Sequence, residues 1–351
     1  MNSHRYIARF IVEADTPLFV GSGEASLITD ALVQRDFNGL PMIYGTSLAG
    51  VLRHSLEDFD QDNSITWKNI FGFQDRKKGC GSRLKVSNAY MMISETQCAE
   101  GIQEIDNYIL NKYQNLPVRQ HVSINDKGAA VKGGLFDNEV CYKGTRFIFE
   151  MELIGNEEDK HSWQKILQSI NNPAFRIGQG TRNGYGKLKV LKEFIRVFDL
   201  KKDFDDYTDY DPSLNASLEF KYHEKDNNDK AYKETNFTEY RLELEPDSLF
   251  FNFSSGYGDK DVDNTPLTEE IALYKPDGIV FEERTVIPAS SIKGALSHRV
   301  CFHYNKLKDN FAEKINREDR KNFLGANNPA VFELFGGEQH VTREGFDNSK
   351  D

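Results

Sequence analysis

The feature that most constrains the fold of this chain is an internal repeat around two helices. Residues 39–59 read GLPMIYGTSLAGVLRHSLEDF, and residues 283–303 read ERTVIPASSIKGALSHRVCFH. Superposing Ser47 on Ser291 matches the following residues: Leu48 with Ile292, Gly50 with Gly294, Leu52 with Leu296, His54 with His298, and Leu56 with Val300. In both copies a Thr-Ser or Ser-Ser pair is expected to supply the N-cap oxygen, and apolar residues then follow with the spacing of an amphipathic helix. The repeat therefore predicts two modules, each built around one capped helix.

The surroundings of each helix also repeat. The period-2 segments RYIARFIVEA and YRLELEP precede the helices and are typical of strands, while WKNIFGF and FELFGGE follow them. The first copy continues through strand-like segments, a long hairpin, a helix at 160–171 and a last strand. This order is close to β-α-β-β-α-β with an inserted hairpin. We therefore expect an α+β protein with a ferredoxin-like (RRM-like) arrangement.

Length and composition predict where the modules end. A chain of 351 residues favours two domains. We expect a complete module over 1–198, an acidic linker with little apolar periodicity over 199–237, and a second module over 238–351. About 60 residues follow Ser291, fewer than the first module needs to complete its sheet. The second module is therefore expected to be partial, and the alternatives are a truncated module, a degenerate module or one completed by another chain.

A glycine-rich stretch, FRIGQGTRNGYGKLKV at 175–190, is the strongest local signal outside the repeat. It contains four glycines and two cations that are candidates for ligand contact: Gly178, Gly180, Gly184, Gly186, Arg182 and Lys187. Such a cluster indicates a tight bend or a close approach of the backbone to a ligand, for which an anion is the favoured class. The spacing and the order helix, loop, strand both argue against a dinucleotide-binding loop.

Composition excludes some classes of function. The net charge of −11 argues against indiscriminate binding of nucleic acid, although local basic patches remain compatible with it. No apolar run approaches a membrane span and the first residues lack the apolar core of a signal peptide, so we expect a cytoplasmic protein without a membrane partner. The cysteines form no C-x-x-C pair and are expected to be reduced, partly buried thiols: Cys80, Cys98, Cys141 and Cys301.

The segments quoted above resemble the RAMP superfamily of CRISPR effector proteins, particularly the backbone subunits of type III complexes. The resemblance covers most of residues 5–195 and a shorter part of 238–340, and includes the stretch VSINDKGAAVKGGLFDNEVCYKGTRFIFEMEL. It implies tandem modules that hold a guide RNA (crRNA) within a complex of several subunits, opposite a target RNA. It also implies that the long hairpin acts as a thumb between nucleotides.

The resemblance and the physics of helix starts together give a set of candidate RNA contacts. Free N–H groups at a helix start, and those of a glycine-rich loop, are suited to phosphate. The candidates are Gly45, Thr46, Ser47, Arg53, His121, Lys132, Gly178, Gly180, Arg182, Gly184, Lys187, Ser290, Ser291 and Lys293. For the basic residues the alternative is an ordinary solvated side chain. The first module departs from the family pattern in having Ala49 where the second has Lys293, and the second has Ala289 in place of Gly45.

The resemblance also implies a catalytic residue. Type III backbone subunits are similar in cutting target RNA with a loop aspartate before the second strand, and the matching residue is Asp30. This carboxylate is expected to bind Mg²⁺ or another divalent cation and to promote attack of a ribose 2′-OH on its own phosphate. Asp36 lies in the following turn, and the matching part of the second module offers Glu269 and Glu270 but no aspartate, so we expect that module not to cut.

Three functions remain open on the sequence. The chain is a guide-RNA-binding subunit that cleaves paired target RNA at Asp30, or a scaffold without chemistry in which Asp30 is a plain loop residue. A guide-RNA-processing endoribonuclease is the third alternative, because His54, His121 and His298 are available as general acids or bases. None of these histidines has an evident orienting partner in the sequence.

Overall fold

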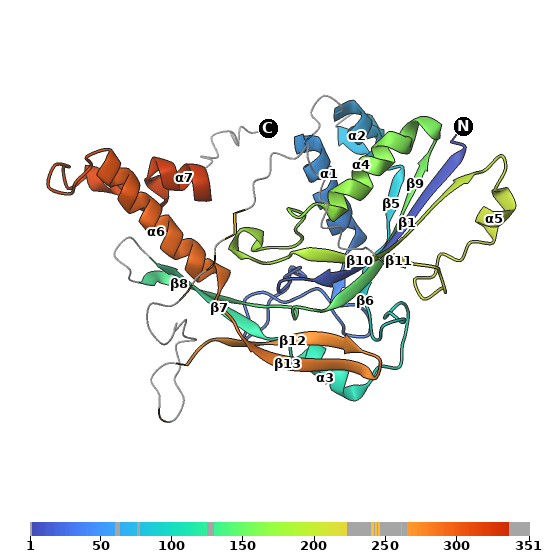
Figure 1. The fold of residues 1–351 in the computed structure, drawn as a ribbon, viewed down its shortest axis with the longest axis horizontal. Helices are drawn as coiled ribbons and strands as arrows, with labels where there is room; N and C mark the ends of the chain where they lie inside the picture. The colour runs from blue at the N-terminus through green and yellow to red at the C-terminus, as the bar shows by residue number, and fades with distance from the viewer. Residues whose placement is uncertain are drawn as a thin grey trace, which may run out of the picture. The chain divides into compact units, whose positions relative to one another are not determined.

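The computed structural model describes most of the chain. The described residues are 2–59, 64–75, 78–124, 130–222, 240, 241, 243, 245, 261 and 265–336. They divide into two compact units (Figure 1). The first unit lies within Met1–Gln120 and Asp137–Val286, and the second lies within His121–Phe136 and Ile287–Asp351.

One seven-stranded sheet forms the framework of the first unit. Its strand order is β11-β10-β1-β9-β6-β2, and β5 also pairs with β9. The strands are β1 (His4–Ala14), β2 (Met42–Ile43), β5 (Leu84–Val86), β6 (Ala89–Met91), β9 (Arg146–Gly155), β10 (Leu188–Asp199) and β11 (Lys221–Tyr222). Every pairing in this sheet is antiparallel. The prediction of an α+β protein is confirmed.

Helices and hairpins surround this framework. The helices are α1 (Gly45–Phe59), α2 (Ser64–Phe71), α3 (Asn107–Gln114), α4 (Lys160–Asn171), α5 (Phe204–Thr208), α6 (Ala289–Leu307) and α7 (Pro329–Phe335). Two-stranded hairpins are formed by β3 (Phe73–Asp75) with β4 (Lys78–Cys80), β7 (Val118–Ile124) with β8 (Ala130–Glu139), and β12 (Thr268–Lys275) with β13 (Gly278–Thr285). Short 3-10 helices lie at Glu157–Asp159, Thr181–Asn183, Asp319–Phe323 and Gly325–Asn327.

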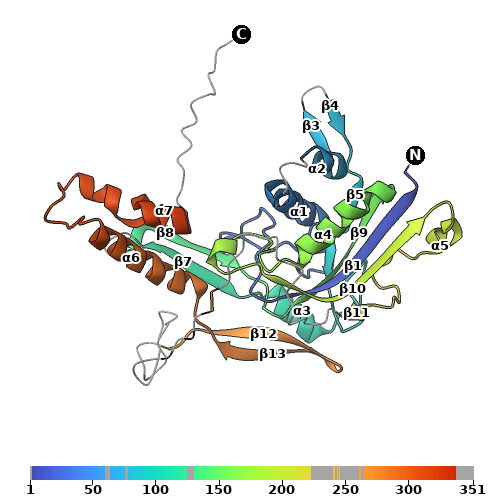
Figure 2. The same cartoon turned by 45° about the horizontal axis from the view of Figure 1, so that its top comes forward.

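The alternation of β1 explains how the sheet is covered. Successive residues of a strand point to opposite faces. Tyr6 and Phe10 share one face: Tyr6 contacts Trp163 of α4, and the Phe10 ring lies 5.5 Å from that of Phe149. Helices α1 and α4 lie side by side on this face (Figures 1 and 2) and bury their apolar stripes in the core.

The segment between β10 and β11, residues 200–220, packs against the opposite face of the sheet. Arg9, fully buried on β1, donates from Nε to Glu150 Oε2 at 2.8 Å and from Nη1 to the Ser213 carbonyl at 2.7 Å. The Tyr210 hydroxyl donates to the same Glu150 oxygen at 2.6 Å. This part of the chain therefore differs from the expected acidic linker, because its aromatic residues and carbonyls satisfy a buried arginine on the sheet. The rest of that predicted linker, 223–237, lies outside the described residues.

The β12–β13 hairpin belongs to the first unit, although the repeat assigned it to the second module. Tyr274 of β12 donates its hydroxyl to the Met92 carbonyl at 2.8 Å and accepts from the Arg146 N–H at 3.2 Å. Burial raises the pKa of this hydroxyl. The Ala272 N–H donates to the Lys143 carbonyl at 2.8 Å. The expected boundary at residue 238 therefore does not separate the two compact units, which divide after Val286 instead.

The Tyr274→Phe variant is expected to unfold at lower denaturant concentration than the natural protein. It leaves two backbone groups in a buried setting without their partner, which costs about 1–3 kcal/mol of the free energy of unfolding. Equilibrium unfolding in urea measures this cost. Tyr222→Phe is the matched control, because Tyr222 is 72% exposed and its loss is expected to change little. Equal midpoints for the two variants would contradict the docking of the hairpin.

The four cysteines are free thiols that differ in burial. Cys98, Cys141 and Cys301 are buried and Cys80 is exposed, and all are free thiols. Burial raises the pKa of Cys98 to about 11 and that of Cys141 to about 12.

None of the helices in the described ranges has the length and apolar content that crossing a membrane requires.

Candidate nucleic-acid interface

The start of α1 shows how the first candidate contacts are held. The first helical bond runs from the Leu48 N–H to the Tyr44 carbonyl at 3.2 Å. Gly45 packs so tightly that a Cβ there would lie 2.2 Å from the Val86 carbonyl oxygen, and its N–H donates to Asn88 Oδ1 at 3.0 Å. The helix therefore begins at a glycine that the fold requires.

The predicted serine and threonine caps are wrong for both helices. Helix α1 begins at Gly45, so Thr46 and Ser47 lie inside its first turn. Helix α6 has Pro288 at its N-cap position with no side-chain cap, so Ser290 and Ser291 also lie inside the first turn. Thr46 is exposed, and within the described residues no protein acceptor is found for its N–H. This amide is the part of the first helix start that is available to a ligand.

The glycine-rich loop is shaped by contact with the protein's own backbone. Gly178, Gly180, Gly184 and Gly186 all have positive φ, between 69° and 92°. A Cβ on Gly178 would lie 2.1 Å from the Phe19 carbonyl oxygen, and one on Gly186 would lie 2.0 Å from the Ile177 carbonyl oxygen. These glycines therefore allow a close approach, but the backbone they approach is that of the protein.

Several N–H groups of this loop already have protein acceptors. Gln179 donates to the Phe19 carbonyl at 2.8 Å, Gly186 donates to the Pro17 carbonyl at 3.0 Å, and Lys187 donates to Thr16 Oγ1 at 3.0 Å. The expectation that the glycines turn the loop's amides toward phosphate is wrong at these positions. Within the described chain, Gly178, Gly180 and Gly184 have amides without such an acceptor, so they remain candidates.

The two candidate cations of the loop, Arg182 and Lys187, differ in their surroundings. Lys187 Nζ lies 2.8 Å from Asp15 Oδ2. Burial raises the pKa of Asp15, but the hydrogen bond and charge of Lys187, with Lys143 and Lys189 nearby, lower it further, so that the net pKa lies below its usual value. Arg182 is exposed and, among the described residues, has no acidic partner. Of the two candidates, Arg182 is therefore the one whose charge is available to a phosphate.

The other candidate RNA contacts lie outside the glycine-rich loop and the first turn of α1. They are Arg53, His121, Lys132 and Lys293. Arg53 on α1 donates from Nη1 to the Gly72 carbonyl at 3.3 Å, so it supports the Phe-Gly turn that follows α2. In the β7–β8 hairpin the His121 ring stacks on Phe136 at 4.9 Å, and Lys132 is exposed. Lys293 lies in α6 of the second unit. No hydrogen bond or ion pair found among the described residues joins the glycine-rich loop to the start of α1.

Asp30 is paired with an aspartate that the sequence analysis missed. The Asp30 N–H donates to Asp137 Oδ1 at 2.8 Å, and the Asp137 N–H donates to Asp30 Oδ2 at 3.1 Å. Asp137 belongs to β8, and 107 positions separate the two residues. The contact continues where the Glu139 N–H donates to the Ala31 carbonyl at 3.0 Å. No local signal in the sequence predicts this pairing.

The turn before Asp30 is closed by its own hydrogen bonds. The Ser26 N–H donates to the Thr29 carbonyl at 2.9 Å, and the Ser26 hydroxyl accepts from the Thr29 N–H at 2.8 Å. Thr29 is buried, whereas Asp30 is exposed. The backbone on both sides of Asp30 is therefore fixed while its carboxylate faces solvent.

The residues present suit a divalent cation only in part. Mg²⁺ in phosphate chemistry is commonly bound by one or two carboxylates together with substrate oxygens and water. Asp30 and Asp137 offer two such carboxylates side by side. Within the described chain, no cluster of three or more potential ligands from His, Cys, Asp and Glu is found. A cation here would therefore need RNA to complete its coordination.

The other acidic residues considered with Asp30 form structural contacts. They are Asp36, Glu269 and Glu270. Asp36 closes a turn by accepting from the Leu40 N–H at 2.8 Å. Glu270 forms an ion pair with Lys112 at 2.6 Å, and Glu269 forms one with Arg119. Both glutamates thus fasten β12 to the first unit.

The fold and these loops define an α+β module in which a loop with an exposed aspartate, a helix start and a glycine-rich loop extend from one antiparallel sheet. A model of the RAMP superfamily matches residues 11–189, so the chain belongs to the RAMP superfamily. That match includes Asp30, the start of α1 and the glycine-rich loop.

Two solved structures have a distant likeness to the chain. A chain of the type III-B Cmr-beta complex in its apo state is 16% identical, with a TM-score of 0.42, over 52% of this chain and 96% of that chain. A chain of type III-B Cmr-beta bound to cognate target RNA is 17% identical, with a TM-score of 0.41, over 52% and 96% respectively. No curated protein matches the chain.

Proposed function

We propose that this protein is a guide-RNA-binding backbone subunit of a type III-like CRISPR effector complex, and that its first module cleaves target RNA paired to the guide. The observation that carries the proposal is the RAMP match over residues 11–189, which covers the candidate loops together. Its partners are then guide RNA, target RNA and neighbouring effector subunits.

The strand order supports a ferredoxin-like assignment of the first module. Reading β1, α1, β5 with β6, β9, α4 and β10 along the chain gives β-α-β-β-α-β, and the corresponding part of the sheet has the order β10-β1-β9-β6. In this assignment the β7–β8 hairpin is an insertion before the third strand of the motif. We propose that it is the thumb, with His121 and Lys132 directed at RNA.

The RNA backbone is proposed to contact the groups that the protein leaves available. These are the Thr46 amide at the start of α1, the amides of Gly178, Gly180 and Gly184, and the Arg182 guanidinium. Contacts of this kind fix the position of an RNA without reading its sequence. Lys187 has a smaller part, because Asp15 already neutralises its charge.

RNA binding by the purified full chain tests this assignment. Arg182→Ala is expected to weaken binding about 10-fold at low salt, for RNAs of any sequence, because a hydrogen-bonded charge contact is lost. The slope of log K against log salt is expected to fall by about 0.7–0.9, the contribution of one phosphate contact. Lys187→Ala is the matched comparison and is expected to change the slope less. Absence of RNA binding by the natural protein would overturn the proposed function.

The proposed reaction is a transesterification in the target strand. A ribose 2′-OH attacks the adjacent phosphorus, the O2′–P bond forms as the P–O5′ bond breaks, the 2′-OH loses its proton to solvent and the 5′ oxygen gains one. A divalent cation, when bound, would offset the charge that develops on the phosphate. Asp30 and Asp137 would hold that cation against the scissile phosphate. The fixed turn at Ser26–Thr29 keeps the Asp30 carboxylate in one position, and such preorganisation favours the transition state.

A scaffold without chemistry is the second candidate function. It is favoured by the lack of a three-ligand cluster among the described residues. In that case Asp30 and Asp137 serve only to join the loop to β8 through their reciprocal hydrogen bonds. The two functions differ in whether the assembled complex cuts target RNA.

A further inference from the structure

Helix α6 has a charge pattern that differs from that of the whole chain. The protein has a net charge of −11, yet the 19 residues Ala289–Leu307 include no aspartate or glutamate. The helix contains Lys293, Arg299 and Lys306 together with two histidines. Local positive charge in an acidic protein favours an anionic partner at this helix.

The repeat shows which face of α6 corresponds to the buried face of α1. Leu48, Leu52 and Leu56 of α1 are at most 6% exposed in the core, and Leu296 is the counterpart of Leu52. At about 100° per residue, Cys301 lies about 140° and Asn305 about 180° around the helix from Leu296. The face that contains Cys301 and Asn305 is therefore not the face that a second sheet would cover.

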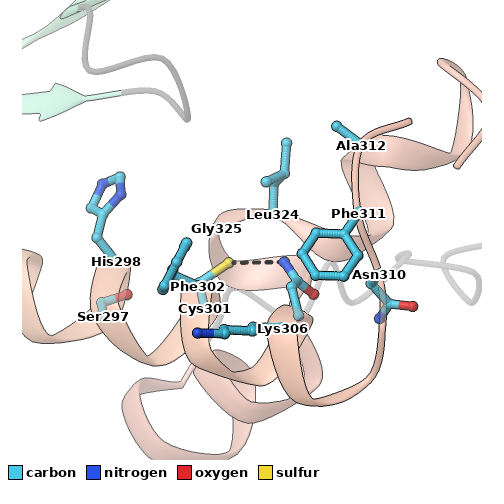
Figure 3. A pocket seen from close by; sticks show the side chains of 11 residues that line it. Ser297, His298, Cys301, Phe302, Lys306, Asn310, Phe311, Ala312, Leu324 and Gly325 are labelled. Atoms are coloured by element: carbon cyan, nitrogen blue, oxygen red, sulfur yellow. Dashed lines mark hydrogen bonds between the residues drawn. The ribbon is translucent and has the colours of Figure 1, made fainter. Parts of the chain in front are cut away.

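A cavity of about 420 Å³ lies on this other face, entirely within the second unit. Its lining comes from α6 on one side and from segments 310–312 and 324–325 on the other (Figure 3). Cavities of this size hold small ligands.

The polar floor of the cavity is already satisfied. Asn305 Nδ2 donates to the Phe323 carbonyl at 2.9 Å, and the Cys301 thiol donates to the same oxygen at 3.3 Å. Asn328 Nδ2 donates to Asn305 Oδ1 at 3.2 Å. This network fastens α6 to the segment that forms the opposite wall. A ligand in the cavity would therefore contact mainly the walls and the rim.

The walls carry exposed aromatic rings and the rim carries cations. Phe302 is 52% exposed and Phe311 is 43% exposed. The Arg299 guanidinium lies 5.1 Å from the centre of the Phe302 ring. Lys306, one turn after Phe302, is exposed, and within the described residues no carboxylate lies at ion-pair distance from it. Lys314 at Phe311 is neutralised by Asp309, with which it forms an ion pair.

We propose that this cavity binds one unpaired nucleotide of single-stranded RNA, with the base against Phe302 and Phe311 and the phosphate at Lys306. Exposed aromatic faces beside cations are the recurrent elements of single-strand recognition, since every base can stack and every nucleotide has a phosphate. An apolar protein helix would match the walls but would leave the positive rim without an anionic partner. The site is separate from the first module and does not depend on Asp30 being catalytic.

Photo-crosslinking of the full chain to a 4-thiouridine-labelled octauridine, followed by peptide mapping, tests the proposal. The expected crosslink lies in the peptides that contain residues 297–312. Phe302→Leu is expected to reduce this crosslink and its apparent affinity by roughly 5- to 100-fold, the range that base stacking provides. Lys306→Gln, an exposed substitution that leaves the fold intact, is expected to lower the salt slope of this crosslink by about 0.7.

Matched variants separate this site from other RNA contacts. Phe332→Leu on α7 and Lys308→Gln beyond the end of α6 do not line the cavity and are expected to leave the crosslink unchanged. Arg182→Ala is expected to affect crosslinks in the first module only. Crosslinks confined to the first module, or a Phe302→Leu protein with unchanged crosslinking at 297–312, would overturn the nucleotide site. If Phe302→Leu weakens binding of a protein and leaves the RNA crosslink unchanged, the cavity binds a polypeptide and the nucleotide site is overturned.

Discussion

The Asp30→Asn variant, assembled with guide RNA and a complementary target, is expected to cut the target on the order of 10³-fold more slowly than the natural complex. A cation that stabilises transition-state charge contributes several kcal/mol, and about 4 kcal/mol corresponds to this factor. The amide retains an oxygen that can accept the Asp137 N–H, so the loop is expected to keep its structure. RNA affinity is expected to change little, because the carboxylate acts on the transition state.

The controls follow from the contacts of each acidic residue. Asp137→Asn is expected to slow cleavage as well, whereas Glu270→Gln is expected to leave it unchanged because its partner is Lys112. Asp36 is a poor control, since its carboxylate closes a turn. Chelation of divalent ions is expected to reproduce the Asp30→Asn defect. A complex that never cuts, or that cuts equally well without the Asp30 carboxylate, is a scaffold.

The Gly186→Ala variant is expected to be among the most destabilised single substitutions in the chain. Its φ is +77°, which disfavours any residue with a side chain, and a Cβ would lie 2.0 Å from the Ile177 carbonyl oxygen. The backbone must move to relieve the overlap, and this would disturb the hydrogen bond from Gly186 to Pro17. A loss of at least about 3 kcal/mol in the free energy of unfolding is expected.

The Gly101→Ala variant separates the two causes of this loss of stability, which are backbone strain at positive φ and overlap of the added Cβ with neighbouring atoms. Gly101 has a similar φ of +72°, but no atom lies within 4 Å of an added Cβ. Its substitution is expected to cost only the conformational strain, about 1–2 kcal/mol. Denaturant unfolding of both variants gives the difference. Similar losses would mean that the glycine-rich loop adjusts without strain.

The parts of the fold that sequence predicts are those with local periodicity. Strand β1 and the helix after Ser47 both appear as expected, because their apolar residues are buried in the core. The N-caps were misplaced, because a cap depends on backbone angles that residue type alone does not determine. Gly45 begins α1 through a fit against Val86, which lies 41 positions further along the chain, and that contact has no local signature.

The candidate site was predicted less completely, for the same physical reason. The position of Asp30 follows from the order of family motifs, but Asp137 reaches it only through the return of β8. The acidic stretch after β10 resembled a linker in composition, yet Tyr210 and the Ser213 carbonyl bind Arg9. Charge density alone does not distinguish a solvated segment from one held by a buried cation.

The segment 200–220, which packs against the sheet, limits how this module can recognise an RNA. An open sheet with exposed rings reads individual bases by stacking them on its surface. Here that surface is closed by Arg9, Glu150 and Tyr210, so bases cannot lie across it. If RNA binds as proposed, the module contacts its phosphates and does not read its base sequence.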